Sequence, residues 1–340
     1  MTRTSVQIDR DEDLSVFSKL DERIFALYLS SQWQLSDKWK IRAGLRTEQT
    51  DTELDENGLR VVDRNYTNVF PNVVSDFTLS ERSNLSFSYA KGIARPTFSD
   101  LAPFVFYSNP VTLFYGNPAL LPGISEHIDI NYALGEYWAN LGYAKTANRI
   151  TPFQPQFDRV QEIVVYNSEN LKSSQVFSLQ LGFPLKPFKS LSINNTLTPN
   201  NSRLETKKTG DILNIFGLNY QGNMTVRLPK NFSIGINGIL FYNQNWGIMK
   251  FAPYGKVDLG IRKTFESNDS TLGITFSDLS GSYFWDFNIL DGYSEDLVAS
   301  GKYTFGMLGF RISFSTSFGN NEIKKKEIDT GSQSEKSRIN

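Results

Sequence analysis

The chain has 340 residues, and its 35 basic and 36 acidic side chains leave a formal net charge of -1. This balance offers no basic surface for nucleic acid, which is therefore not an expected partner. There is no cysteine and one histidine, His127, which excludes disulfides, thiolate metal sites and cysteine nucleophiles and argues against histidine-based chemistry. No apolar run approaches the about 18 residues of a transmembrane helix, but a membrane barrel needs no such run because its strands alternate.

The first 20 residues carry charge throughout and lack the apolar stretch of a secretory signal peptide. Two explanations are open at this point. Either the protein stays in the cytoplasm, or the chain begins in the middle of a longer protein.

From about Glu22 to Phe318 the chain alternates between apolar and polar residues in runs of roughly ten. In the last run, Phe310, Ile312 and Phe314 fall on one face. A period of two over segments this long predicts β-strands. The other apolar faces, in chain order, are Ile41, Ala43 and Leu45; Leu85, Phe87 and Tyr89; Ile128, Ile130 and Tyr132; Phe177, Leu179, Leu181 and Phe183; Phe216, Leu218 and Tyr220; Phe232, Ile234 and Ile236; and Leu272, Ile274 and Phe276.

Short polar turns alternate with longer links along the chain. The predicted short turns lie at 36–38, 81–84, 134–136, 184–189, 229–231 and 266–269, and the longer links lie at 50–67, 92–123, 146–170, 200–211, 244–252 and 290–296. We count about 13 strands, the first beginning near Glu22. Short turns on one side and long loops on the other are typical of an outer-membrane barrel, with periplasmic turns and extracellular loops.

A soluble β-sandwich also alternates and has frequent turns. Three features favour the barrel over the sandwich. Several runs are near 12 residues long, the non-apolar face is rich in Ser, Asn, Gly, Thr and Gln, and Tyr and Phe gather near the strand ends, where a membrane girdle would place them.

The link Gly92–Gly123 carries the most specific pattern. After Phe87-Ser88-Tyr89 come Arg95-Pro96, then Asp100-Leu101-Ala102-Pro103-Phe104, then Gly116-Asn117-Pro118-Ala119-Leu120-Leu121-Pro122. This segment resembles TonB-dependent receptors, and more closely the Bacteroidetes outer-membrane β-barrel family related to them. That family usually has Glu where this chain has Gly123.

Two further stretches and the end of the chain carry the same resemblance. Phe17, Glu22, Ile24, Ala26 and Tyr28 are similar to a strand of the family, with Leu20 where it usually has Tyr. The run Gly44–Glu48 resembles its Gly-Leu-Arg-Tyr-Glu, also without the Tyr, and Thr316 to Gly319 with the polar residues that follow resembles its last strand and tail.

The resemblance implies an all-β fold: an antiparallel transmembrane β-barrel, whose about 13 strands here form the C-terminal part of a barrel of about 22 strands with a plugged lumen. It implies that the plug domain and the remaining strands lie outside this chain. We expect residues 1–21 to be the remnant of an extracellular loop or strand, 22–319 the barrel portion, and 320–340 a disordered periplasmic tail.

Few residues are candidates for chemistry. His127 shares a strand face with Asp129 and points into the lumen, where a packing role is favoured over ligand binding. The acidic run 51–56, DTELDE, is interpreted as a solvated loop rather than a cation site, because it lacks the glycine spacing of a calcium loop. Arg95 and Asp100 are expected to fix the link 92–123 across the barrel mouth, with contact between Arg95 and an anionic substrate as the alternative.

The aromatic residues of the same link, Tyr107, Phe114 and Tyr115, either pack within it or face a substrate; the pattern does not separate these. No nucleophile–base pair, phosphate-binding glycine loop or metal-ligand spacing is present, so we expect no enzyme activity, no cofactor and no metal site.

The resemblance implies uptake of a nutrient or metal complex across the bacterial outer membrane by a receptor driven through a TonB-type energy transducer. Its partners would be outer-membrane lipid and the missing plug and strands. Two alternatives stay open: a self-contained passive channel of about 14 strands, with residues 4–17 as an extra strand, and a soluble or surface-exposed β-rich binding protein.

Overall fold

The computed structural model describes residues 17–101, 105–109, 111–158, 160–207, 210, 212–266, 269–289, 300–306 and 308–316. Within these ranges the chain is almost entirely β-structure, and its single helix is the one-turn α1 (Phe98–Leu101). No helix in the described ranges is long and apolar enough to cross a membrane. The expected tail, 320–340, lies outside the described residues, as do 1–16 and the link 290–296.

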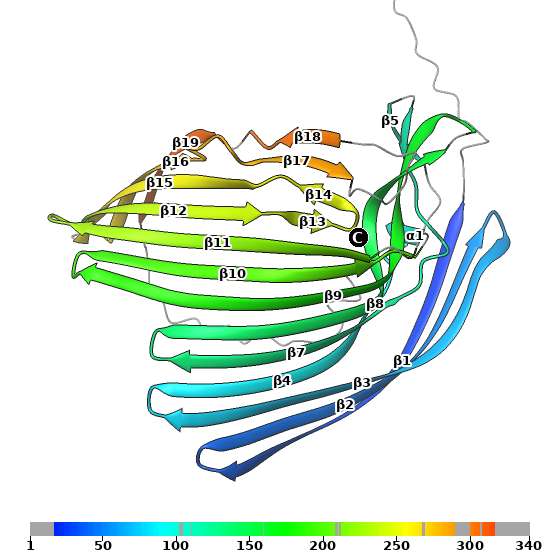
Figure 1. Ribbon diagram of the computed structural model, residues 1–340, viewed down its shortest axis with the longest axis horizontal. Helices are drawn as coiled ribbons and strands as arrows, with labels where there is room; N and C mark the ends of the chain where they lie inside the picture. The colour runs from blue at the N-terminus through cyan, green and yellow to red at the C-terminus, as the bar shows by residue number, and fades with distance from the viewer. Residues whose placement is uncertain are drawn as a thin grey trace, which may run out of the picture.

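One curved antiparallel sheet forms most of the molecule (Figure 1). The strands of its main path follow one another in chain order, with some strands of the chain lying off this path, and their number confirms the expected count of about 13 strands. The strands are β1 (Ser18–Ser36), β2 (Trp39–Glu56), β3 (Leu59–Ser80), β4 (Ser83–Ala94), β7 (Gly123–Leu134), β8 (Tyr137–Asp158), β9 (Ile163–Phe188), β10 (Leu191–Glu205), β11 (Ile212–Leu228), β12 (Phe232–Tyr242), β15 (Tyr254–Phe265), β16 (Ser270–Ser277) and β19 (Gly309–Thr316).

The two faces of this sheet differ as the alternation predicts. One face exposes large apolar side chains, among them Phe177, Phe216 and Phe314, which are 51%, 56% and 65% exposed. The other face carries hydrogen-bonded polar groups: the amide Nδ2 of Asn140, for example, donates to Oδ1 of Asn131 at 2.7 Å. An apolar outer face and a polar inner face are the arrangement of a membrane barrel, inverted relative to a soluble one.

The two ends of the strands also differ. At one end the connections are short, such as Asp37 and Lys38 between β1 and β2 and Gly135 and Glu136 between β7 and β8. At the other end several hairpins continue well past the barrel wall, and Figure 1 shows β1 to β3 sweeping away from the other strands. By the rule for outer-membrane barrels, the short turns face the periplasm and the long hairpins face the cell exterior.

Three of the links that the sequence pattern predicts as loops, 50–67, 146–170 and 244–252, are largely strands instead, and that part of the prediction is wrong. Residues 50–67 continue β2 and β3 around a tight turn at Asn57 and Gly58, both at positive φ (49° and 82°). Positive φ at both central residues is the twist-matched turn that Asn-Gly favours. Similarly, 146–170 is largely β8 and β9. These hairpins extend into water and carry charged residues, so their sequence lacks the clear apolar–polar alternation by which the other strands are predicted.

A smaller layer lies at the exterior end. Strands β13 (Gln244–Trp246), β14 (Met249–Phe251), β17 (Phe284–Ile289) and β18 (Ser300–Thr304) form a four-stranded sheet. The link between β4 and β7 contains α1, β5 (Phe106–Asn109) and β6 (Thr112–Phe114), and β6 pairs in parallel with β9.

The main sheet does not close within the described residues. Its path ends at β1 on one side and at β19 on the other, and these strands lie at opposite margins in Figure 1. Each has one row of backbone groups without a neighbouring strand along this path. This open seam matters for function, because a membrane tolerates no unpaired strand edge.

Candidate functional site

The candidate site is the set of contacts that holds residues 95–101 and 117–121 against the inner faces of β2, β3 and β9; we call it the mouth anchor. It begins where Pro96 ends β4, because proline has no N–H for the ladder. The guanidinium NH2 of the preceding Arg95 donates to Oε2 of Glu48 and, at 3.1 Å, to Oγ1 of Thr50. The Arg95 and Glu48 side chains are only 4% and 6% exposed, so this is a buried ion pair.

Glu48 is held from both sides. Its second carboxylate oxygen, Oε1, accepts a hydrogen bond from Nε of Arg46, two residues earlier on the same face of β2. A buried carboxylate needs such compensation, because loss of one partner of a buried pair costs about 3–5 kcal/mol. The pair therefore fixes the point at which the link leaves the wall.

Asp100 has a different task, which is to cap the single turn of α1. Its Oδ2 accepts from the backbone N of Thr97 at 2.9 Å, and its own backbone N donates to Oγ1 of Thr97 at 3.2 Å. Together these bonds form a reciprocal capping box. The other oxygen, Oδ1, accepts from the hydroxyl of Ser168 on β9 at 2.6 Å, so the cap also ties the link to the wall.

The Asn-Pro-Ala-Leu motif is fastened mainly through its backbone. The Arg64 guanidinium on β3 donates to the carbonyls of Pro118, at 2.9 Å, and Leu120. Asn170 on β9 forms two bonds with the backbone of Leu121: its Oδ1 accepts from the Leu121 N at 2.7 Å, and its Nδ2 donates to the Leu121 O at 2.9 Å. Irregular backbone near a membrane must satisfy its polar groups in this way.

A small apolar core completes the anchor. Leu120 is fully buried against Leu54 on β2, Val62 on β3 and Leu101 of α1. Leu54 lies on the inner face of β2 with Thr50 and Thr52. The acidic residues that alternate with them point to the other face of the strand. Leu120, the leucine of the Asn-Pro-Ala-Leu motif, is thus the residue of the link that fills this core. The hydrogen bonds from Arg64 to the carbonyls of Pro118 and Leu120 hold it in position.

The aromatic candidates lie outside the anchor. Phe114 on β6 stacks on Tyr166 of β9 with ring centroids 4.9 Å apart, and Tyr115 is 37% exposed. Tyr107 belongs to β5, whose side chains are outside the described part of the structure. His127 lies on the inner face of β7, between Ala90 of β4 and Ala144 of β8 in the ladder. The structure therefore gathers Arg95 and Asp100 and leaves His127 apart; whether any of them contacts a substrate stays a prediction.

Sequence reasoning missed an aromatic path that continues from Phe114. The path runs from Phe114 to Phe153, Trp246, Trp285 and Phe305, with centroid distances of 6.0, 6.4, 6.3 and 4.8 Å. It joins the β8–β9 hairpin to the four-stranded sheet. The available signals were Trp246 in the predicted link 244–252 and Trp285 just before the predicted link 290–296.

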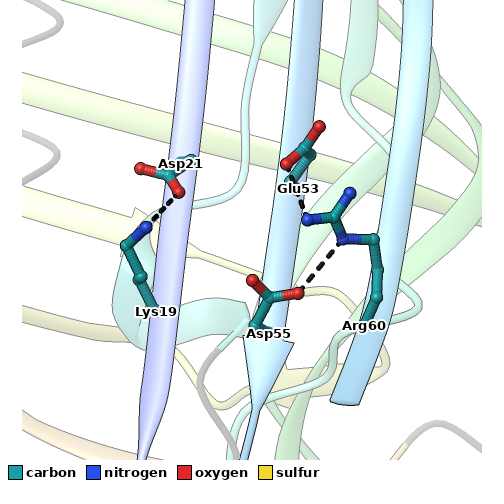
Figure 2. Close-up of polar contacts among 5 residues, drawn as sticks. All are labelled: Lys19, Asp21, Glu53, Asp55 and Arg60. Atoms are coloured by element: carbon teal, nitrogen blue, oxygen red, sulfur yellow. Dashed lines mark hydrogen bonds and ion pairs between the residues drawn. The ribbon is translucent and has the colours of Figure 1, made fainter. Parts of the chain in front are cut away.

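Two of the four acidic residues in the run 51–56 form ion pairs with one basic neighbour, and a separate ion pair lies beside them on β1 (Figure 2). Arg60, across the turn on β3, contacts Glu53 at 2.8 Å and Asp55 at 3.1 Å, while Lys19 on β1 pairs with Asp21 at 2.7 Å. The hydrogen bond to Asp55 raises the pKa of Arg60, and the hydrogen bond from Lys19 lowers the pKa of Asp21. No group of three or more His, Cys, Asp or Glu side chains in the described ranges is arranged to hold a metal ion.

Comparison with known proteins decides the family. The sequence matches the outer membrane protein beta-barrel family over residues 2–315. The chain belongs to this family. Its place is therefore the bacterial outer membrane, as the alternation, the apolar outer face and the long exterior hairpins indicate. No curated protein matches the sequence.

Three solved structures that are similar to this chain are receptors or transporters by name. The copper transporter OprC has a TM-score of 0.60 at 13% identity, over 83% of this chain and 46% of that one. The ferric yersiniabactin uptake receptor from Yersinia pestis has a TM-score of 0.58 at 12% identity, over 89% and 47%. A mutant of the ferric enterobactin receptor from Pseudomonas aeruginosa has a TM-score of 0.51 at 20% identity, over 76% and 40%. At these identities the likeness shows the fold, and the chain spans less than half of each structure.

Proposed function

We propose that the chain is the barrel portion of a TonB-dependent receptor-like transporter that takes up a nutrient or metal complex. The observation that carries this proposal is the combination of an open seam with an anchored exterior link. A passive pore needs a closed wall and a free mouth, whereas residues 95–101 and 117–121 are fixed to strands from both β2–β3 and β9. The fold shared with the copper transporter and the siderophore receptors supports the same proposal.

The strand count supports further strands in the working barrel. Counted along the ladder, β1 and β19 are the first and thirteenth strands, so in an antiparallel sheet they run in the same direction. Joining them directly would require parallel pairing at the seam. An odd number of additional strands closes the barrel with antiparallel pairs throughout, and membrane barrels of one chain have an even total. We infer that the plug and these strands belong to the same receptor, which would then contact its energy transducer through the plug.

The passive channel is the second candidate, since a closed barrel with a polar lumen conducts ions. Uptake in cells separates the two. A strain lacking its own receptors would express the full-length protein and be offered a panel of radiolabelled iron complexes, copper and cobalamin. We expect uptake of at least one compound that stops when a protonophore removes the energy supply. Uptake that is insensitive to the protonophore, with ion conductance in planar bilayers, would overturn the proposal in favour of the channel.

A further inference from the structure

A row of polar residues crosses the outer wall at the exterior edge of the apolar band. The ladder places the six side by side on consecutive strands, and all share the face that carries the exposed apolar residues. They are Lys91 on β4, Glu126 on β7, Lys145 on β8, Gln175 on β9, Arg203 on β10 and Asn214 on β11.

The next outward-facing residue on each strand, two positions toward the periplasm, is mostly aromatic. Tyr89, Tyr143, Phe177 and Phe216 occupy this position on β4, β8, β9 and β11. Phe177 and Phe216 are more than half exposed. Aromatic girdles mark the boundary between hydrocarbon and headgroups in such barrels, so the polar row lies at headgroup level.

The number of residues between the polar row and the periplasmic turns also places the row near the exterior edge of the apolar band. Eight residues separate Lys145 from Tyr137, the first residue of β8, and eight separate Glu126 from Leu134, the last residue of β7. At about 3.3 Å per residue and a tilt of about 40°, eight residues rise about 20 Å along the membrane normal. The apolar band of an outer-membrane barrel is about 25 Å tall.

The three cations of this row form no ion pair with a described residue, although Glu205 lies two residues beyond Arg203 on the same face of β10 and interacts with it electrostatically. In the described part of the chain, no carboxylate lies within 4.0 Å of the charged nitrogens of Lys91, Lys145 or Arg203. Even Glu126, the cross-strand neighbour of both lysines, makes no ion pair with either. Three cations and one anion give the row itself a net charge of +2, next to an outer band that is mostly apolar; Glu205, beyond the row, is paired with Lys172.

We propose that this row binds the phosphate of a lipid headgroup in the exterior leaflet. Neighbouring strands are about 4.8 Å apart, so Lys91 and Lys145 stand about 10 Å apart, and Lys145 and Arg203 likewise. Two long side chains at that spacing can converge on one phosphate between them. The amides of Gln175 and Asn214 add donors for headgroup oxygens, and Gln175 is oriented by a hydrogen bond from the hydroxyl of Tyr143 at 3.4 Å.

The proposal is tested with lipid A, a phosphate-bearing glycolipid, titrated into the full-length protein in detergent and read by native mass spectrometry. Basic residues at an anionic membrane surface contribute about fivefold each to binding, so three together contribute on the order of a hundredfold. We expect the variant K91Q/K145Q/R203Q to lose roughly this much affinity. The variant K38Q/K189Q/K230Q removes the same charge from the periplasmic turns and should bind lipid A as the wild type does.

Two comparison arms identify the ligand. Dephosphorylated lipid A should bind the wild type no better than it binds the triple variant, and inorganic phosphate at millimolar concentration should not displace lipid A. Equal losses in the two triple variants, or binding that does not depend on the phosphate, would overturn the proposal. Full displacement by inorganic phosphate would also overturn it, because the row would then bind a free anion.

Discussion

The barrel wall and the mouth anchor of this protein are stabilised in different ways. The wall relies on a repeated backbone ladder, in which any apolar side chain suits an outward position and any small polar side chain an inward one. The anchor relies on particular side chains, each with its own partner: Arg95 with Glu48, Asp100 with Ser168 and Asn170 with Leu121. Substitutions in the wall should therefore act through which face they fall on, and substitutions in the anchor through the partner they remove.

The largest effect is expected at the buried ion pair. Arg95→Ala leaves Glu48 buried with half of its compensation, and Glu48→Ala does the same to Arg95, so either should lower the free energy of unfolding by about 3–5 kcal/mol. Limited proteolysis of the link 95–121 and thermal melting would measure this. Replacing both partners together, Arg95→Met with Glu48→Leu, should cost much less.

The matched control for this pair is Arg42→Ala. Arg42 pairs with Asp76 at 3.0 Å on the inner face, but both side chains are exposed, so its loss should change stability by less than about 1 kcal/mol. If Arg42→Ala lowers the free energy of unfolding as much as Arg95→Ala does, burial does not explain the contribution of the Arg95–Glu48 pair.

In the wall, the face decides the effect. Phe314 faces lipid, while Ser313 lies on the inner side with Thr275 and Gly273. Arginine on the lipid face near the midplane costs about 2–4 kcal/mol, so Phe314→Arg should reduce the heat-modifiable folded band far more than Ser313→Arg. Equal yields for the two variants would show that the register of β19 is wrong.

A smaller effect is expected in the exterior layer. Gly247 has a positive φ of 59°, and an added Cβ would lie 2.2 Å from Oε1 of Gln154, the acceptor of the Ile248 backbone N–H. Gly247→Ala should therefore cost about 1–3 kcal/mol in thermal stability. Gly238, in the wall, has nothing within 4 Å of an added Cβ, so Gly238→Ala should be close to neutral. A neutral Gly247→Ala would argue against the close packing of this layer.

The smallest effect is a dependence on pH at the exterior end of β10. A hydrogen bond from Lys172 holds the pKa of Glu205 below its usual value. Its contribution is present above the pKa of the unfolded chain, about 4.3, and is lost as pH falls through the folded pKa. Hydrogen exchange of the β9–β10 hairpin should be slightly faster in Glu205→Gln than in the wild type at pH 7, and this difference should shrink as pH falls and the Glu205 carboxylate of the wild type takes up a proton. A difference that stays constant while this carboxylate is protonated would exclude the ion pair as its cause.

The contrast between wall and anchor also explains what the sequence could predict. The strands, their number and their outward faces follow from a period of two, because the ladder imposes it on every strand. The Arg-Pro and Asn-Pro-Ala-Leu motifs identified the link that carries the mouth anchor, and their role at the barrel mouth stays a prediction. The partner of Arg95 could not be predicted, because Glu48 lies 47 residues away and only the register of β2 brings it there. The extended hairpin at 50–67 was hidden by its acidic residues, whose partner Arg60 comes from the opposite strand.

The open seam between β1 and β19 is the most direct test of the proposed role. The chain has no cysteine, so an engineered pair supplies the only two thiols within it. Leu27 on β1 would be changed to cysteine together with Phe310, Ile312 or Phe314 on β19, each in turn, in the full-length protein in outer membranes. L27C/T47C, which joins paired residues of β1 and β2, is the positive control. We expect the control to form a disulfide and every seam pair to remain reduced, because other strands separate β1 from β19. A disulfide at any seam position as efficient as the control would contradict this, and would show that these strands close on themselves as a smaller channel.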